Sequence, residues 1–199
     1  MRIKRIIIAL GILVSASTAF ANLSLTSSAM KNGGDFPYHY GYCQPNEHGT
    51  VKISADISPP LSWSGAPKAT QSYALVLMDP SASSSTDFNV KGKMVPKHKE
   101  RMSVFHWVVA NIPASQTHMP EGAGSKGFKA GGKKPGQTAY GLMGTNVYTG
   151  AFSSPYASRI TFSPHKVNDM KGIYGQYDGP CAPWNDNVIH NYTFTLYAL

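Results

Sequence analysis

The stretch Ser72-Tyr-Ala-Leu-Val-Leu-Met-Asp-Pro80 is the most informative part of this sequence for the fold. Its apolar run up to Met78 predicts a central strand that is covered on both faces. The strand is expected to end at Asp79 and Pro80, because proline has no amide hydrogen to donate to a neighbouring strand. A second apolar run, residues 104–112, is followed by Pro113 and predicts another long strand.

Shorter strands are predicted at three further places: residues 51–55, residues 159–162, and residues 192–199, where alternation and strand-forming residues coincide. Short turns near residues 166–174 are the best helical candidates. The 19 glycines and 14 prolines also favour short strands and many turns over helices.

Two long polar stretches, residues 81–101 and 113–157, are predicted to be loops that carry function or decorate the fold. A length of 199 residues corresponds to one domain, and 42% hydrophobic residues suffice for a core, which excludes wholesale disorder. The predicted fold is all-β: two antiparallel sheets packed as a β-sandwich, with long loops and few short helices.

Residues 1–21 have the pattern of a signal peptide. Arg2, Lys4 and Arg5 precede an apolar run, and Ala19-Phe-Ala21 supplies a small-x-small cleavage site. Cleavage would leave residues 22–199 as a single domain and lower the net charge from +8 to +5. We therefore expect an exported protein, periplasmic or secreted, that does not span a membrane, with an uncleaved anchor as the alternative.

Cys43 and Cys181 are the two cysteines of the chain. In an oxidising compartment such an even pair predicts a disulfide, and two buried free thiols are the alternative. Metal binding by this pair is disfavoured, because the sequence contains no C-x-x-C spacing.

Strand phase brings candidate site residues together. In its predicted strand, Asp79 points to the same face as the apolar residues 73, 75 and 77. In the second predicted strand, His106 points to the same face as Val108, Ala110 and Ile112. If the two strands pair antiparallel, the end of the first meets the start of the second, so both polar side chains lie at one rim and face inward.

His190 and Tyr192 share the phase of the last strand and would reach the same rim. Two imidazoles and a phenol can donate hydrogen bonds to a small oxyanion such as phosphate, a protonated histidine adds charge, and a carboxylate can fix a tautomer. The alternatives are structural: Asp79 as a strand-ending turn, His106 as a core histidine, and His190 as a loop end.

Other signals are weaker. Residues 122–127 match G-x-G-x-x-G, but no strand precedes them as a dinucleotide site requires. Lysines gather at residues 91–101 and, as Lys126, Lys129, Lys133 and Lys134, further on; we interpret both groups as solvated loops, which if functional would favour an anionic surface near the pocket. Nucleic acid is not an expected partner, because export disfavours it and neither group has interleaved aromatic residues.

Ordered segments over most of residues 22–199 resemble a known family. They begin with residues 25–43, Ile57-Ser-Pro-Pro-Leu-Ser-Trp-Ser-Gly-Ala-Pro67 and the strand 72–80 that ends in Asp-Pro. They continue with Phe105-His-Trp-Val-Val-Ala-Asn-Ile-Pro113, Met119-Pro-Glu-Gly122, Tyr177-Asp-Gly-Pro-Cys-Ala-Pro183, and His190-Asn-Tyr192 before residues 194–199. In them the chain resembles the phosphatidylethanolamine-binding protein family, specifically its bacterial Raf-kinase-inhibitor-like branch.

The resemblance implies a β-sandwich with a small anion-binding pocket, no established catalytic reaction, no cofactor and no metal. It also suits a bridge between Cys43 and Cys181, and it makes a homodimer plausible. By motif, the pocket residues are Asp79, Pro80, His106, Gly179, Pro180, His190 and Tyr192.

The chain departs from the family's pattern at two places. The usual Asp-Pro-Asp-Ala-Pro reads Asp79-Pro-Ser-Ala-Ser83, and the usual His-Arg-Tyr reads His190-Asn-Tyr192. A carboxylate, a proline and an arginine are therefore missing, which affects ligand choice and partner contacts.

These observations predict a non-enzymatic binding protein for phosphate-type or phospholipid head groups, with modulation of a partner protein as a further expectation. One alternative is an inhibitor of a protease or kinase that docks through its long loops. The other is a hydrolase that uses a His/Asp pair or a metal, although the common hydrolase motifs are absent.

Overall fold

The computed structural model describes residues 22–46, 50–155, 157, 162–163 and 165–199. The predicted signal peptide, residues 1–21, lies outside the described residues, as do residues 159–161 of the short predicted strand.

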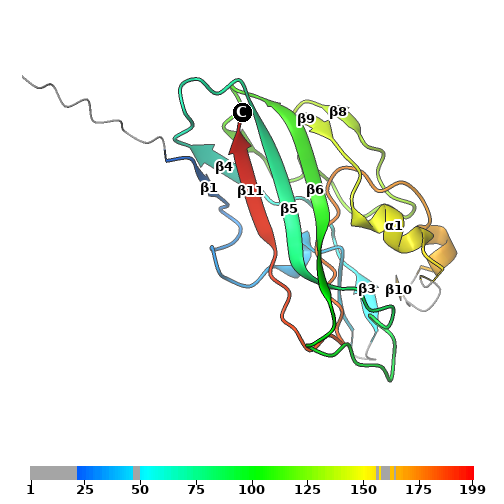
Figure 1. Ribbon diagram of the computed structural model, residues 1–199. Coiled ribbons are helices and arrows are strands. Elements are labelled where there is room, and N and C mark those ends of the chain that lie inside the picture. The colour runs from blue at the N-terminus through cyan, green and yellow to red at the C-terminus, as the bar shows by residue number, and fades with distance from the viewer. Residues whose placement is uncertain (1–21, 47–49, 156, 158–161, 164) are drawn as a thin grey trace, which may run out of the picture.

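A five-stranded antiparallel sheet forms the main layer, in the order β11-β5-β6-β9-β8 (Figure 1). Its strands are β5 (Ser72–Ser83), β6 (Arg101–Pro113), β8 (Gly136–Thr138), β9 (Gly141–Met143) and β11 (Thr193–Ala198). The two longest are those predicted from the apolar runs, but the predicted end of the first at Asp79 and Pro80 is wrong. β5 continues to Ser83, because a register shift in its pairing with β6 between Asp79 and Ala82 accommodates Pro80. The predicted covering of both faces of β5 is wrong, because residues 73, 75, 77 and 79 are buried whereas the alternate side chains from Ala74 to Met78 are only half-buried.

Two three-stranded sheets complete the strand structure. The order β1-β4-β7 joins Ser24–Thr26, Leu61–Ser64 and His118–Met119, and the order β10-β3-β2 joins Phe162–Ser163, Val51–Ile53 and Cys43–Pro45. The all-β fold class is confirmed. The simple two-sheet description is modified in two respects: the described strands form three sheets, and β10 and β3 pair in parallel.

The stretch 113–157 is not a loop, contrary to prediction. It contains β7, β8, β9 and one α-helix, α1 (Val147–Ser153), which begins after Asn146, whose side chain accepts a hydrogen bond from the backbone N–H of Tyr148 at 3.0 Å. These strands have two or three residues each, too few to show alternation. Two 3-10 turns, η1 (Tyr38–Tyr40) and η3 (Val167–Met170), are the other helical elements described, and η3 lies within the predicted turns.

Two clusters of buried side chains hold these layers together. The larger contains Leu61 and Trp63 of β4 against Leu75 of β5 and Trp107 of β6, and therefore lies between the main sheet and the β1-β4-β7 sheet. Gly124 packs on this core, because a Cβ there would lie 2.3 Å from Cζ2 of Trp107. The smaller cluster joins β2 and β3 to α1. No helix within the described residues is long and apolar enough to cross a bilayer.

Candidate functional site

His106 reaches the inner face of the sheet through a β-bulge. Leu77 pairs with Trp107 and Met78 with Phe105, so β6 has one extra residue at His106. Consequently His106, Trp107, Val109 and Ile112 are buried. The predicted phase with Val108 and Ala110 is wrong, although the predicted inward position of His106 is correct.

Asp79 and His190 lie together near the end of β5, with Asp79 four residues before the last residue of the strand, as phase predicted. The side chain of His190, 4% exposed, donates from Nδ1 to Oδ2 of Asp79 at 2.6 Å and from Nε2 to Oδ2 of Asp186 at 3.2 Å. Asp79 also accepts from the backbone N–H of Ser81 at 2.7 Å, which makes the turn through Pro80. Both ring nitrogens of His190 and both carboxylate oxygens of Asp79 are therefore engaged.

Arg101 extends this chain of charges. Its Nη1 lies 2.5 Å from Oδ2 of Asp186 and also donates to the carbonyl oxygen of Ser81, and its Nη2 donates to that of Pro96. Two cations thus face two carboxylates, Asp79 and Asp186. Neither Asp186 nor Arg101 was among the predicted site residues, because their role depends on contacts between β6 and the segment before β11.

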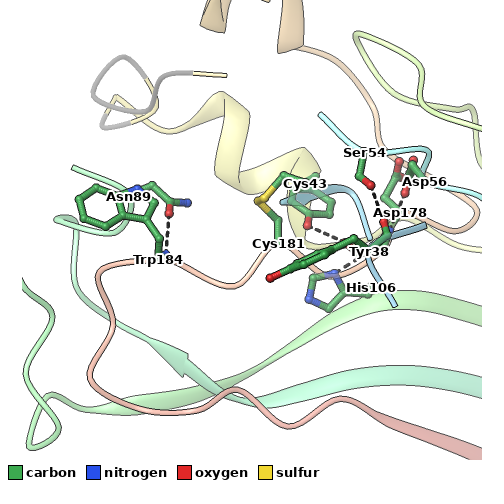
Figure 2. The surroundings of a disulfide bond; sticks show 11 residues. Tyr38, Cys43, Ser54, Asp56, Asn89, His106, Asp178, Cys181 and Trp184 are labelled. Atoms are coloured by element: carbon green, nitrogen blue, oxygen red, sulfur yellow. Dashed lines mark hydrogen bonds between the residues drawn. A yellow bond between two sulfur atoms is a disulfide. The ribbon is translucent and has the colours of Figure 1, made fainter. Parts of the chain in front are cut away.

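The two histidines have opposite electrostatic surroundings. Burial opposes the charge of His190, but its hydrogen bonds to Asp79 and Asp186 outweigh that effect and raise its pKa. Burial lowers the pKa of His106 to about 4, against the charge of Asp79. The Nδ1–H of His106 donates to the carbonyl oxygen of Asp178 at 3.2 Å (Figure 2), which leaves Nε2 as the free acceptor of a neutral ring.

Tyr192 completes the predicted cluster. Its ring makes an edge contact with His106, with centroids 5.5 Å apart, and stacks beside His190 at 6.4 Å. Burial raises the pKa of Tyr192, and the charge of Asp79 raises it further, so the phenol remains protonated. Within the described part of the chain, the ring of His106 bonds through Nδ1 to Asp178, and the nearby backbone of Gly179 also acts on its pKa, whereas Tyr192 contacts His106 and His190 through ring packing alone.

Gly179 and Pro180 form a rigid wall beside His106. The carbonyl oxygen of Gly179 accepts from the hydroxyl of Tyr148 at 2.7 Å, and that of Pro180 accepts from the backbone N–H of Tyr42 at 2.8 Å. A Cβ at residue 179 would lie 1.9 Å from the carbonyl oxygen of Tyr40, so only glycine fits.

A buried ion cluster lies behind this wall and was not predicted. Nζ of Lys133 lies 2.6 Å from Oδ2 of Asp56 and 2.6 Å from Oδ1 of Asp178, and Asn146 donates to Asp178 at 2.7 Å. Oδ1 of Asp56 accepts from the backbone N–H of Gly179 at 2.7 Å. Burial raises the pKa of both carboxyl groups, against the charge of Lys133. Interpreting Lys133 as part of a solvated loop was wrong, because it is 8% exposed.

The predicted disulfide between Cys43 and Cys181 is present (Figure 2). Their Cα atoms are 4.9 Å apart, and 138 residues separate them in sequence. The bond joins β2 to the segment that follows Pro180. A bridge of this kind is compatible with an oxidising compartment.

A cavity of about 240 Å³ opens beside the disulfide. We call it the Tyr192 cavity; its walls include Phe36, Cys43, Pro180, Trp184 and Tyr192. It shares Pro180 and Tyr192 with the predicted site residues, whereas Asp79, His106 and His190 do not line it. The predicted polar cluster is thus adjacent to an apolar cavity through Tyr192.

The G-x-G-x-x-G loop has its amides engaged within the fold. The N–H groups of Gly124 and Ser125 donate to Oγ of Ser58, and that of Gly122 donates to the carbonyl oxygen of Ser58. Amides that are already paired cannot cradle a phosphate. The described residues also contain no group of three His, Cys, Asp or Glu side chains arranged to hold a metal ion.

The family of phosphatidylethanolamine-binding proteins matches residues 26–199, most of the chain. The chain belongs to this family. YbcL of Escherichia coli K12, a UPF0098 protein, is 26% identical over 186 residues, which cover 94% of this chain and 73% of YbcL. A UPF0098 protein of Methanothermobacter thermautotrophicus is 28% identical over 72% of this chain and 61% of its own length.

Solved structures show the same fold. The crystal structure of Escherichia coli YbcL aligns with a TM-score of 0.54 at 22% identity, covering 89% of this chain and 76% of YbcL. A phosphatidylethanolamine-binding protein homologue of Chlamydia trachomatis aligns with a TM-score of 0.51 at 23% identity, covering 90% of this chain and 76% of that protein.

Proposed function

We propose that this member of the family is a non-enzymatic binding protein that holds a small phosphate-type ligand, free or as a phospholipid head group, between His106 and Tyr192. One observation carries the proposal. In a cluster where Asp79 and His190 bond to each other, Nε2 of His106 and the hydroxyl of Tyr192 are two neighbouring polar groups that bond to no other side chain in the described structure.

The protonation of these two groups selects the form of the ligand. The phenol of Tyr192 donates, whereas Nε2 of neutral His106 accepts, so among free phosphates and monoesters the best partner is the form that carries one proton. The phosphodiester of a phospholipid has no such proton, so with a phospholipid the ammonium of the head group would donate to Nε2 instead. The positive charge of His190 is balanced by Asp79 and Asp186, so the site has little net positive charge with which to attract a doubly charged phosphate. Since a phosphate monoester loses its second proton at about pH 6, affinity should fall as the pH rises above that value.

The Tyr192 cavity supports a phospholipid as the source of the phosphate. It starts at the ring of Tyr192, and apolar side chains such as Phe36 and Trp184 line it. The part of a lipid next to its head group would enter this space while the phosphate contacts the hydroxyl. The family description, phosphatidylethanolamine-binding protein, agrees with this assignment.

Two further features support binding without catalysis and support export. His190 donates from both ring nitrogens, so it has no lone pair with which to take a proton from a nucleophile.

The disulfide between Cys43 and Cys181 supports export, because it fits the oxidising compartment to which a signal peptide at residues 1–21 would direct the protein.

Calorimetric titration with inorganic phosphate and with O-phosphoethanolamine tests the proposal. Tyr192→Phe removes only the hydroxyl and should weaken binding at least about tenfold, the loss of a hydrogen bond to a charged group. Tyr197→Phe removes an exposed hydroxyl on β11, away from the site, and should leave binding unchanged. Equal affinities for both variants and the original protein would refute the site.

A further inference from the structure

We infer that the loop between β5 and β6 is a docking surface for an anionic lipid bilayer. The surface, which we call the basic loop, does not depend on the ligand site proposed above. It is formed by five exposed residues of the loop, Lys91, Lys93, Met94, Lys97 and Lys99, together with the exposed Ile189 of the neighbouring segment before β11.

Asn185 organises the first half of the loop. Its Nδ2 donates to the carbonyl oxygens of Asp87 at 2.8 Å and Lys93 at 3.1 Å, and its Oδ1 accepts from the backbone N–H of Asn89 at 2.7 Å. Asn89 in turn accepts from the backbone N–H of Trp184 at 3.1 Å (Figure 2). These contacts give the loop a defined conformation, so its exposed side chains form a fixed surface.

Val95 joins the loop to the segment that carries Ile189. Val95 is fully buried; its N–H donates to the carbonyl oxygen of Asn185 at 2.9 Å, and its own carbonyl accepts from Asn187 at 3.0 Å. Met94 is 58% exposed and Ile189 is 85% exposed. Met94 directly precedes this buried anchor, and Ile189 comes two residues after Asn187, which bonds to the anchor, so both exposed apolar side chains belong to backbone that Val95 holds together.

The charges around these apolar side chains select the partner. Four exposed lysines lie within nine residues of the loop, and the loop has two acidic residues, Asp87 and Glu100, so its net charge is positive. Lysines that surround exposed aliphatic side chains are typical of surfaces that insert a few apolar groups at the headgroup level of an anionic membrane. A stacking partner such as a nucleic acid would require exposed aromatic side chains, whereas Phe88 of this loop is partly buried and packs against the smaller core cluster.

The basic loop lies at the same end of the β5–β6 hairpin as the candidate site (Figure 1). Arg101 connects the two, because it donates to the carbonyl oxygen of Pro96 in the loop and pairs with Asp186 of the charge chain. A bilayer held by the loop would therefore be close to the entrance of the site.

Vesicle co-sedimentation tests this inference with the full chain. Vesicles of phosphatidylglycerol and phosphatidylcholine should bind the protein at low salt, and vesicles of phosphatidylcholine alone should bind it much less. In the variant K91Q/K93Q/K97Q, affinity for the anionic vesicles should fall by about a hundredfold, or about fivefold per lysine.

Three further variants separate the contribution of the loop from that of net charge and of exposed apolar side chains elsewhere. K126Q/K129Q/K134Q removes three exposed lysines elsewhere and should lower the affinity by less than about threefold. Met94→Ser with Ile189→Ser should weaken binding at high salt, whereas Ile173→Ser, at another exposed isoleucine, should not. Equal losses in the two lysine variants, or equal binding to neutral and anionic vesicles, would overturn the inference.

Discussion

Nδ1 of His190 lies 2.6 Å from Oδ2 of Asp79, so the imidazole and the carboxylate satisfy each other. The opposite ring nitrogen donates to Asp186. His190 is therefore a cation that bridges two carboxylates, and its charge holds the end of β5 to the segment before β11. This arrangement leaves His106 and Tyr192 as the groups that we propose contact a ligand.

Replacing His190 by glutamine should destabilise the fold. Removing the cation leaves Asp79 without a charged partner at a site where it is 2% exposed, and breaking a buried pair costs about 3 kcal/mol. Urea denaturation at neutral pH measures this loss. His98→Gln, at an exposed histidine of the basic loop, should change the free energy of unfolding by less than about 0.5 kcal/mol. A stable His190→Gln protein would show that the pair contributes nothing.

The contribution of His190 should depend on pH in a definite direction. Its pKa is raised in the folded protein, so its stabilisation is complete below about pH 6.5, the pKa of an unfolded-state histidine, and disappears as the pH rises through the folded pKa. The difference in unfolding free energy between the original protein and His190→Gln should therefore shrink as the pH rises above about 6.5. A difference that grows over this range would contradict the assigned charge.

Lys133 should be more important for stability than its neighbour Lys134. Lys133→Met leaves Asp56 and Asp178 buried without their shared cation, which should cost about 3–5 kcal/mol. Lys134→Met changes an exposed side chain and should cost less than about 0.5 kcal/mol. Thermal and urea denaturation of the two variants make the comparison. Similar losses would mean that the buried cluster contributes no net stability.

These cases show which features could be predicted from sequence. The inward direction of Asp79 followed from strand phase, because β5 alternates without interruption through that residue. The burial of His106 depends on a bulge, which is set by pairing with β5 and leaves no periodic signal in β6. Lys133 was assigned to solvent because its partners, Asp56 and Asp178, are distant in sequence and only the fold brings them together.

Reduction of the disulfide should lower the stability of the protein. The bond between Cys43 and Cys181 closes a loop of 138 residues, for which chain entropy gives an upper value of about 5 kcal/mol. Urea denaturation with and without dithiothreitol measures the difference. The double variant Cys43→Ser, Cys181→Ser should already be destabilised and should not respond to the reductant. A response of the double variant would show that the reductant acts elsewhere.

Gly124 and Gly150 should respond oppositely to alanine. A Cβ at residue 124 meets the indole of Trp107 at 2.3 Å, so Gly124→Ala should cost about 1–3 kcal/mol. Gly150 lies in α1 with nothing within 4 Å of the added Cβ, so Gly150→Ala should stabilise by about 0.5–1 kcal/mol. Thermal denaturation distinguishes the two; a stabilising Gly124→Ala would mean that this part of the core can move.

The most direct test of the central claim is an NMR titration of the histidine side chains with inorganic phosphate at about pH 6. We predict that the Nε2 resonance of His106 shifts in a saturable manner and that Tyr192→Phe weakens this shift. The resonances of His190 should stay those of a doubly protonated ring throughout. Saturable shifts of His190 with no change at His106, or no saturable shift at either ring, would contradict the assignment of the ligand to His106 and Tyr192.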